Sequence, residues 1–132
     1  LDINLAASLL KTKYGDYINK DGTNNKGNKI EKNPEYKLSL GASYYAPMGI
    51  YTRLDGNMIG KTYFDAQNKL AQKSYFTADA KVGYIKDGLD LYFYVKNLTD
   101  KEYFSHIRDR ASNVLVTYGK GRTLGVGVRY SF

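Results

Sequence analysis

The stretch TLGVGVRYSF, residues 123–132, alternates apolar and polar side chains up to its last residue. Successive side chains of a β-strand point to opposite faces, so such a run has one apolar face and one polar face. The alternation predicts a strand over 122–132. Because the end of a soluble domain is usually polar and frayed, we expect this strand to be part of the folded structure. Its predicted apolar face carries Leu124, Val126, Val128, Tyr130 and Phe132.

The same alternation occurs in five earlier stretches, and the six together predict an all-β fold. Two short turns between them, APMG and KDG, are typical of tight antiparallel hairpins in which glycine adopts a positive φ. Strands joined in this way form an up-and-down meander, with long connections at one end and short turns at the other, as in outer-membrane barrels. The predicted strands cover residues 1–14, 36–45, 50–63, 75–85, 89–96 and 122–132, and the connections cover 15–35, 46–49, 64–74, 86–88 and 97–121.

The two faces of the predicted strands differ in charge. One face carries only uncharged residues, and the other carries charges of both signs among small polar residues. This contrast suits a membrane barrel with a wet interior, but a soluble β-sandwich also buries one face and exposes the other. Tyr36 and Tyr44 lie on one strand, as do Phe76 and Tyr84, and each pair would be separated by roughly 20 Å along a membrane normal. That spacing approximates two aromatic girdles and favours the barrel.

The composition of the 132 residues excludes several classes of protein. There is no cysteine, which excludes disulfides and thiolate chemistry, and no apolar run of about eighteen residues, which excludes a transmembrane helix. The net charge of +7 is spread over loop lysines without a recognition helix, so we expect no nucleic-acid partner. No catalytic grouping, cofactor motif or metal-ligand set is found, so we expect neither an enzyme nor a cofactor or metal. Because Leu1 opens directly on an alternating pattern, we expect a piece of a longer protein.

Two groups of polar residues are candidates for a binding site. His106, Arg108 and Arg110 stand close together in the last long connection, where they could bind an anionic ligand through charge-assisted hydrogen bonds. The alternative is a solvated cluster of loop charges. The NLTD segment, 97–100, follows a predicted strand, so turn capping by its side chains is favoured over ligand binding. The segment 18–29 lacks the spacing of a phosphate or calcium loop, and we predict a mobile external loop there.

Three stretches resemble segments of TonB-dependent outer-membrane receptors. LYFYVKNLTDKEYF, residues 91–104, resembles a late barrel segment in which an apolar strand is followed by N-L-[TF]-[DN]-K-x-Y. GKGRTLGVGVRYSF, residues 119–132, resembles the family's final strand, with its G-x-[GP]-R start and terminal Phe. GNKIEKNPEYKLSLGASYY, residues 27–45, resembles an upstream segment, although Glu31 stands where the family often has proline. The matching motif residues are Asn97, Leu98, Thr99, Asp100, Lys101, Tyr103, Gly121 and Arg122.

The resemblance implies that residues 1–132 are the C-terminal six strands of a 22-stranded barrel in the bacterial outer membrane. Such a barrel imports a scarce nutrient, for example an iron–siderophore complex, haem or cobalamin. The resemblance also implies that Val126, Val128, Tyr130 and Phe132 form a signal for the outer-membrane assembly machinery. The expected partners are outer-membrane lipid and the remaining strands and plug of the same receptor, with TonB contacted only through segments absent here. The alternatives are an autotransporter translocator or small outer-membrane barrel, and a soluble β-sandwich binding module.

Overall fold

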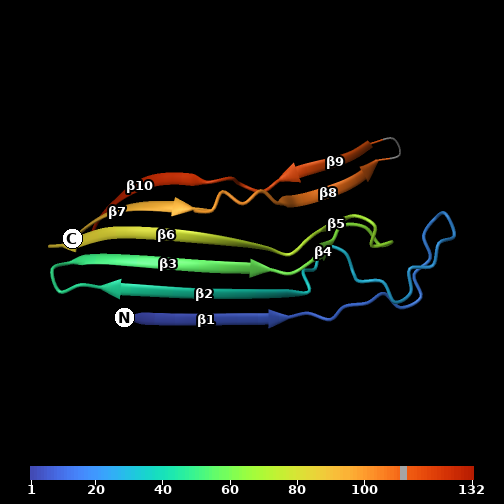
Figure 1. Cartoon of the computed structure of the whole chain (residues 1–132), viewed down its shortest axis with the longest axis horizontal. Coiled ribbons are helices and arrows are strands. Elements are labelled where there is room, and N and C mark those ends of the chain that lie inside the picture. Colours follow the sequence, from blue (N-terminus) through green and yellow to red (C-terminus); the bar gives the residue numbers. More distant parts are fainter. Residues whose placement is uncertain (111–112) are drawn as a thin grey trace.

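The computed structural model describes residues 1–110 and 113–132 (Figure 1). Six strands form one antiparallel sheet in the order β1-β2-β3-β6-β7-β10, and two further pairs, β4–β5 and β8–β9, form separate small sheets. Across the described ranges no helix is long and apolar enough to cross a membrane. The strands are β1 (Asp2–Leu9), β2 (Tyr36–Tyr45), β3 (Ile50–Ile59), β4 (Thr62–Tyr63), β5 (Ala71–Gln72), β6 (Tyr75–Lys86), β7 (Leu89–Lys96), β8 (Phe104–Arg110), β9 (Asn113–Tyr118) and β10 (Thr123–Tyr130).

The main sheet is an up-and-down arrangement, which confirms the predicted all-β meander. Each strand pairs with the next sheet strand along the chain, and every pair is antiparallel. Figure 1 shows the two short turns, after β2 and after β6, at one end of the sheet, together with both termini. The three long connections lie at the opposite end. The asymmetry predicted from the connection lengths is therefore present.

Three predicted strands run past the ends of the observed strands; the one predicted over 122–132 is a strand only over Thr123–Tyr130, β10. The strand predicted over 1–14 ends at Leu9, because Leu9 pairs with Tyr36, the first residue of β2, and no strand continues beyond that pair. The strand predicted over 50–63 breaks at Gly60. The Gly60 amide still donates to the Tyr36 carbonyl at 2.8 Å, but the residues that follow form β4. The alternation correctly predicts which residues of these strands share a face, but it does not predict where the strands end.

The long connections contain strands that the sequence does not predict. The connection predicted over 97–121 holds the β8–β9 hairpin, and the connection predicted over 64–74 is closed by the β4–β5 pair. Residues 111 and 112, which belong to the connection 97–121, lie outside the described residues. The β8 sequence, FSHIRDR, places charges close together and lacks a period-two pattern. The strand signal is therefore absent even though the backbone pairs.

The first long connection, 15–35, is held by contacts of its own backbone. Ile18 and Asn24 form an isolated antiparallel bridge. Asn25 is fully buried, and its amide donates to the Tyr17 carbonyl at 2.8 Å. The mobile external loop predicted over 18–29 lies within this connection, and its mobility stays a prediction.

The register of the sheet keeps the predicted apolar residues on one face. Ile3 pairs with Ala42, Ala42 with Leu54, Leu54 with Ala80 and Ala80 with Val95. Val95 in turn pairs with the first apolar residue of β10. Directly opposite residues in a sheet share a face, so this row crosses all six strands on the side predicted to be uncharged.

No layer of the described residues covers the apolar face. Leu5, Leu54 and Val126 are 68%, 60% and 79% exposed, and the buried hydrophobic side chains of the described residues are those of Tyr51 and Ile107. A soluble β-sandwich would place a second sheet on this face, and the described residues form none there. An apolar surface of this extent suits contact with lipid.

One charge borders the apolar face. The prediction kept charges off this face, but β6 runs one residue further than expected, and Lys86 pairs with Leu89 beside the short turn. A lysine at the edge of an apolar band can keep its methylene groups on the apolar surface while its ammonium reaches water. The face is therefore uncharged except at this border.

On the polar face, tyrosine rings lie over glycines of a neighbouring strand. A Cβ atom added at any of these glycines would meet the ring, so only glycine leaves room for it. The Lys81 ammonium lies 3.8 Å from the centre of the Tyr92 ring, a cation–π contact that fixes the ring further. The pairs are Tyr51 with Gly83, Tyr92 with Gly127 and Tyr94 with Gly125.

Candidate functional site

A cavity of about 520 Å³ opens among the long connections, at the end of the sheet opposite the short turns. Its walls come from all three long connections. β8 supplies one wall, and this wall contains all three residues predicted as ligand candidates. The cavity therefore brings together segments that are far apart in the sequence. The lining includes Tyr17, Lys32, Phe64, His106, Arg108 and Arg110.

Two of the three predicted side chains are in direct contact on β8. Arg108 Nε donates to His106 Nε2 at 2.8 Å, and the ring of Phe64 meets the His106 ring edge to face, with centroids 5.7 Å apart. The hydrogen bond orients His106 and occupies a nitrogen that would otherwise be open to a metal. Within residues 1–110 and 113–132, no three His, Asp or Glu side chains are grouped to hold a metal ion.

Charges of both signs line the cavity. The basic side chains face three carboxylates, those of Glu31, Asp65 and Asp109. The Asp65 carboxylate is already used by its own turn, since it accepts from the amides of Lys69 at 3.0 Å and Leu70 at 2.6 Å. The positive and negative residues of the lining nearly balance. An anionic ligand would therefore be held by individual guanidinium and ammonium donors rather than by a large net field.

The sequence does not predict the other two walls of the cavity. They come from connections without a periodic pattern, which meet through asparagine side chains. Asn28 Nδ2 donates to the Ala66 carbonyl at 2.9 Å. Asn68 Oδ1 accepts from the Lys29 amide at 2.6 Å, and its Nδ2 donates to the Lys29 carbonyl at 2.9 Å. The high asparagine content of the connection 15–35 is the signal that could have indicated such contacts.

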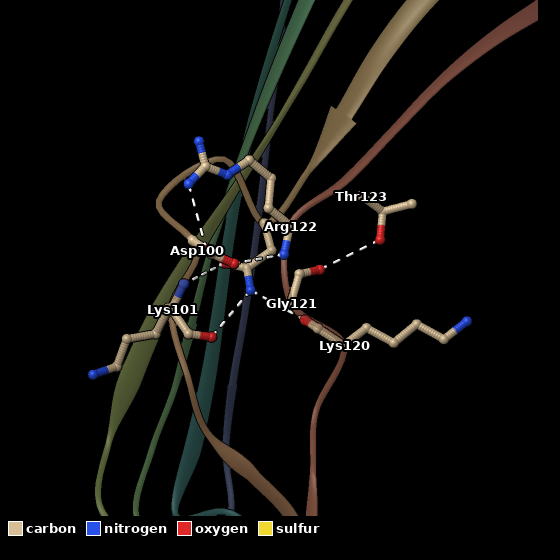
Figure 2. A network of polar contacts seen from close by, with 7 residues as sticks. Asp100, Lys101, Lys120, Gly121, Arg122 and Thr123 are labelled. Atoms are coloured by element: carbon tan, nitrogen blue, oxygen red, sulfur yellow. Dashed lines mark hydrogen bonds and ion pairs between the residues drawn. The ribbon is translucent and has the colours of Figure 1, made fainter.

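A second polar group, the rim clasp, joins β7 to β10 and consists of Asn97, Asp100, Lys101, Lys120 and Arg122. Figure 2 labels the last four of these residues. Asn97 is buried; its Nδ2 donates to the Lys101 and Lys120 carbonyls at 3.0 and 3.1 Å, and its Oδ1 accepts from the Lys101 amide at 2.9 Å. The Asp100 carboxylate accepts from the Arg122 amide at 2.7 Å and from its guanidinium at 3.4 Å. Asn97 and Asp100 have φ of 50° and 52°, a region that Asn and Asp tolerate well. The side chains of the clasp are thus used to cap a turn.

The other motif residues connect the rim clasp to neighbouring strands. The Leu98 amide donates to the Ala78 carbonyl of β6 at 2.6 Å. The Tyr103 ring stacks on Tyr75 with centroids 4.3 Å apart, and its carbonyl accepts from the Gly119 amide at 2.8 Å. The motif therefore connects β6, β7 and β10 where they leave the sheet. The two remaining motif residues are Thr99, which is exposed, and Gly121, which lies beside the Asp100 carboxylate.

The residues predicted as an assembly signal lie on and just after β10. Val126, Val128 and Tyr130 are exposed on the apolar face, and the rings of Tyr130 and Phe132 meet edge to face at 5.3 Å. β10 pairs with β7 along one edge, and its other edge has no partner among the described residues. The four residues are thus accessible at the border of the sheet, and their role in assembly stays a prediction.

Lowering the pH is expected to loosen the rim clasp. Hydrogen bonds from Arg122, chiefly from its backbone amide, hold the pKa of Asp100 below its usual value. A carboxylate with a depressed folded pKa stabilises the fold above its unfolded pKa, and this contribution is lost as the pH falls through the lower folded value. We expect the Arg122 amide to exchange faster below about pH 4, relative to the same amide in Asp100→Asn. A constant ratio between the two proteins from about pH 6 to pH 2 would contradict this.

Comparison with known proteins gives one family and several structural relatives. A family model described as "TonB dependent receptor-like, beta-barrel" matches residues 1–98. The Pesticin receptor of Yersinia pestis is 29% identical over 128 residues, covering 89% of this chain and 19% of the relative. The ferric yersiniabactin uptake receptor FyuA from Yersinia pestis is 29% identical, with a TM-score of 0.73 over 82% of this chain and 18% of that one. The ferric-catecholate import receptor Fiu from K12 E. coli is 26% identical, with a TM-score of 0.76 over 98% of this chain and 18% of that one.

These alignments cover 82–98% of this chain but a small part of each relative. The chain spans 19% of the length of the curated relatives it matches. The β-strands of the solved receptors and those of this chain follow the same path over most of its length.

Proposed function

Because the chain belongs to the TonB-dependent receptor-like β-barrel family, we propose that it forms the C-terminal six strands of an outer-membrane importer of ferric siderophores. Barrels of this family lie in the outer membrane of Gram-negative bacteria, and the family consists of receptors rather than enzymes. The observation that carries the proposal is the exposed, nearly uncharged face of the sheet, which lipid would cover. The family match excludes the three alternatives, which were an autotransporter translocator, a small outer-membrane barrel and a soluble β-sandwich.

In this proposal, residues 1–132 supply part of the wall of a 22-stranded barrel. TonB-dependent receptors interact with the outer membrane and with TonB. The short turns would face the periplasm and the long connections the exterior, as in other outer-membrane barrels. The polar face would line the interior around a plug, TonB would act on segments outside residues 1–132, and the end of β10 would be bound by the assembly machinery.

The cavity among the long connections is the proposed contact for the siderophore. Arg108 and Arg110 would donate to the anionic groups of the ferric complex, while the rings of Tyr17 and Phe64 offer flat apolar contacts. The names of FyuA and Fiu, an uptake receptor for ferric yersiniabactin and an import receptor for ferric catecholates, support a siderophore over haem or cobalamin.

Removing both arginines from the cavity tests this assignment. In the full receptor, the double variant Arg108→Ala, Arg110→Ala is expected to bind its ferric siderophore about 10–100-fold more weakly, because charge-assisted hydrogen bonds are lost. Dissociation constants measured with ferric yersiniabactin, a ferric catecholate, haem and cobalamin give the comparison. The matched control is Lys26→Ala, which removes an exposed loop cation that pairs with Asp16 at 3.0 Å outside the cavity. Binding of haem or cobalamin but of no ferric siderophore would overturn the proposal.

A further inference from the structure

β9 is an apolar strand, and one of its edges has no partner among the described residues. Among the described residues it pairs only with β8, and all six of its residues are exposed. Val114, Leu115 and Val116 are 53%, 49% and 42% exposed. Its sequence, NVLVTY, contains no lysine or proline of the kind that blocks pairing at exposed edges. Such an edge is usually covered in a folded protein.

The edge of β9 continues the edge of β10. β10 pairs with β7 on one side and β9 pairs with β8, and Figure 1 shows β9 and β10 on the same outer side of the molecule. The residues between the two strands, 119–122, are held in place. The Gly119 amide bonds to the Tyr103 carbonyl, the Lys120 carbonyl accepts from Asn97, and the Arg122 amide donates to Asp100. The outer edges of β9 and β10 are therefore continuous across residues 119–122, whose backbone is held by these hydrogen bonds.

We infer that the strand which closes the barrel against β10 extends past the rim of the sheet and also pairs with β9. The inference rests on the proposed function, because only a closed barrel places a strand from outside residues 1–132 on the outer edge of β10. We assign the closing strand to the outer edge of β9 because, in a closed barrel, it already lies next to residues 119–122. Its continuation along β9 adds backbone hydrogen bonds and covers Val114, Leu115 and Val116 without the loss of freedom that binding a separate protein requires.

Amide exchange in the full receptor tests this pairing. Consecutive amides of an antiparallel strand point alternately to its two sides. If β8 alone covers β9, every second amide from 114 to 118 faces solvent. If the closing strand covers the other edge, all of them exchange at least about tenfold more slowly than unpaired loop amides. The measurement uses monomeric receptor in detergent with single-residue resolution, and β10 serves as the internal reference.

Each pattern of exchange has a distinct meaning. Slow exchange at every amide of β9 and β10 supports the inference. Alternating or uniformly fast exchange in β9, with every amide of β10 slow, overturns the inference and leaves the proposed barrel intact. Alternating exchange in β10 as well means that its outer edge is open, which overturns both. Protection of β9 that appears only in a dimeric receptor assigns the edge to a second copy and also overturns the inference.

Discussion

Asn97→Ala is expected to lower the free energy of unfolding of the receptor by about 2.5–6.5 kcal/mol. The substitution removes three hydrogen bonds to the Lys101 and Lys120 backbone, each contributing about 0.5–1.5 kcal/mol. It also places alanine at a φ of 50°, which costs roughly 1–2 kcal/mol for a residue other than Gly, Asn or Asp. Denaturant unfolding in detergent micelles, followed by loss of β-sheet circular dichroism, measures the change.

Two further variants separate the causes of this loss. Asn97→Gly keeps the backbone conformation and removes the hydrogen bonds, so it should recover the roughly 1–2 kcal/mol that belongs to φ. Asn97→Asp keeps the acceptor for the Lys101 amide but sets a buried carboxylate oxygen against the Lys101 and Lys120 carbonyls, so its loss should be at least as large as that of Asn97→Ala. If all three variants unfold like the unsubstituted receptor, the rim clasp does not stabilise the barrel.

Gly49→Ala is expected to lower the free energy of unfolding by about 2–5 kcal/mol. Gly49 closes the short turn after β2 with a φ of 92°, and its carbonyl accepts from the Ile85 amide at 2.9 Å. A Cβ at this position would meet the Ile85 carbonyl oxygen, which is backbone and cannot rotate away. The strained φ costs roughly 1–2 kcal/mol and the displaced backbone about 1–3 kcal/mol. The fraction of receptor that resists unfolding in SDS at room temperature gives a direct assay.

The matched control for this change is Gly15→Ala. Gly15 has no positive φ, and a Cβ there meets nothing within 4 Å. Its effect should therefore stay within about 0.5 kcal/mol. Equal loss of folded receptor in Gly15→Ala and Gly49→Ala would show that the turn geometry is not the cause.

The sheet was predictable because membrane contact imposes a pattern on every strand. β2 and β7 begin and end at the predicted residues, since lipid on one side and water on the other require strict alternation. β8 and β9 were missed for the opposite reason. They lie among the long connections, where no face has to be uncharged, so FSHIRDR and NVLVTY carry no comparable signal. Backbone pairing formed the hairpin without a pattern in its side chains.

The candidate site was predictable only where its residues are neighbours in the sequence. His106, Arg108 and Arg110 were found as a local cluster of charges, and they do line one cavity. Tyr17 and Phe64 reach the same cavity from other connections, through contacts such as that of Asn28 with Ala66. Those contacts depend on how the loops fold over one another. Spacing within a single segment gives no information about them.

The tyrosine rings that lie over Gly83, Gly125 and Gly127 also determine how much clearance the interior of the barrel has. Because each ring extends over the backbone of the neighbouring strand, it projects less into the interior than an upright ring would. The contact of the Lys81 ammonium with the Tyr92 ring also keeps the long lysine side chain from projecting freely into the interior. In the proposed importer, a bulky substrate moving along this wall would pass over tyrosine rings and their hydroxyl groups, with fewer flexible side chains to displace.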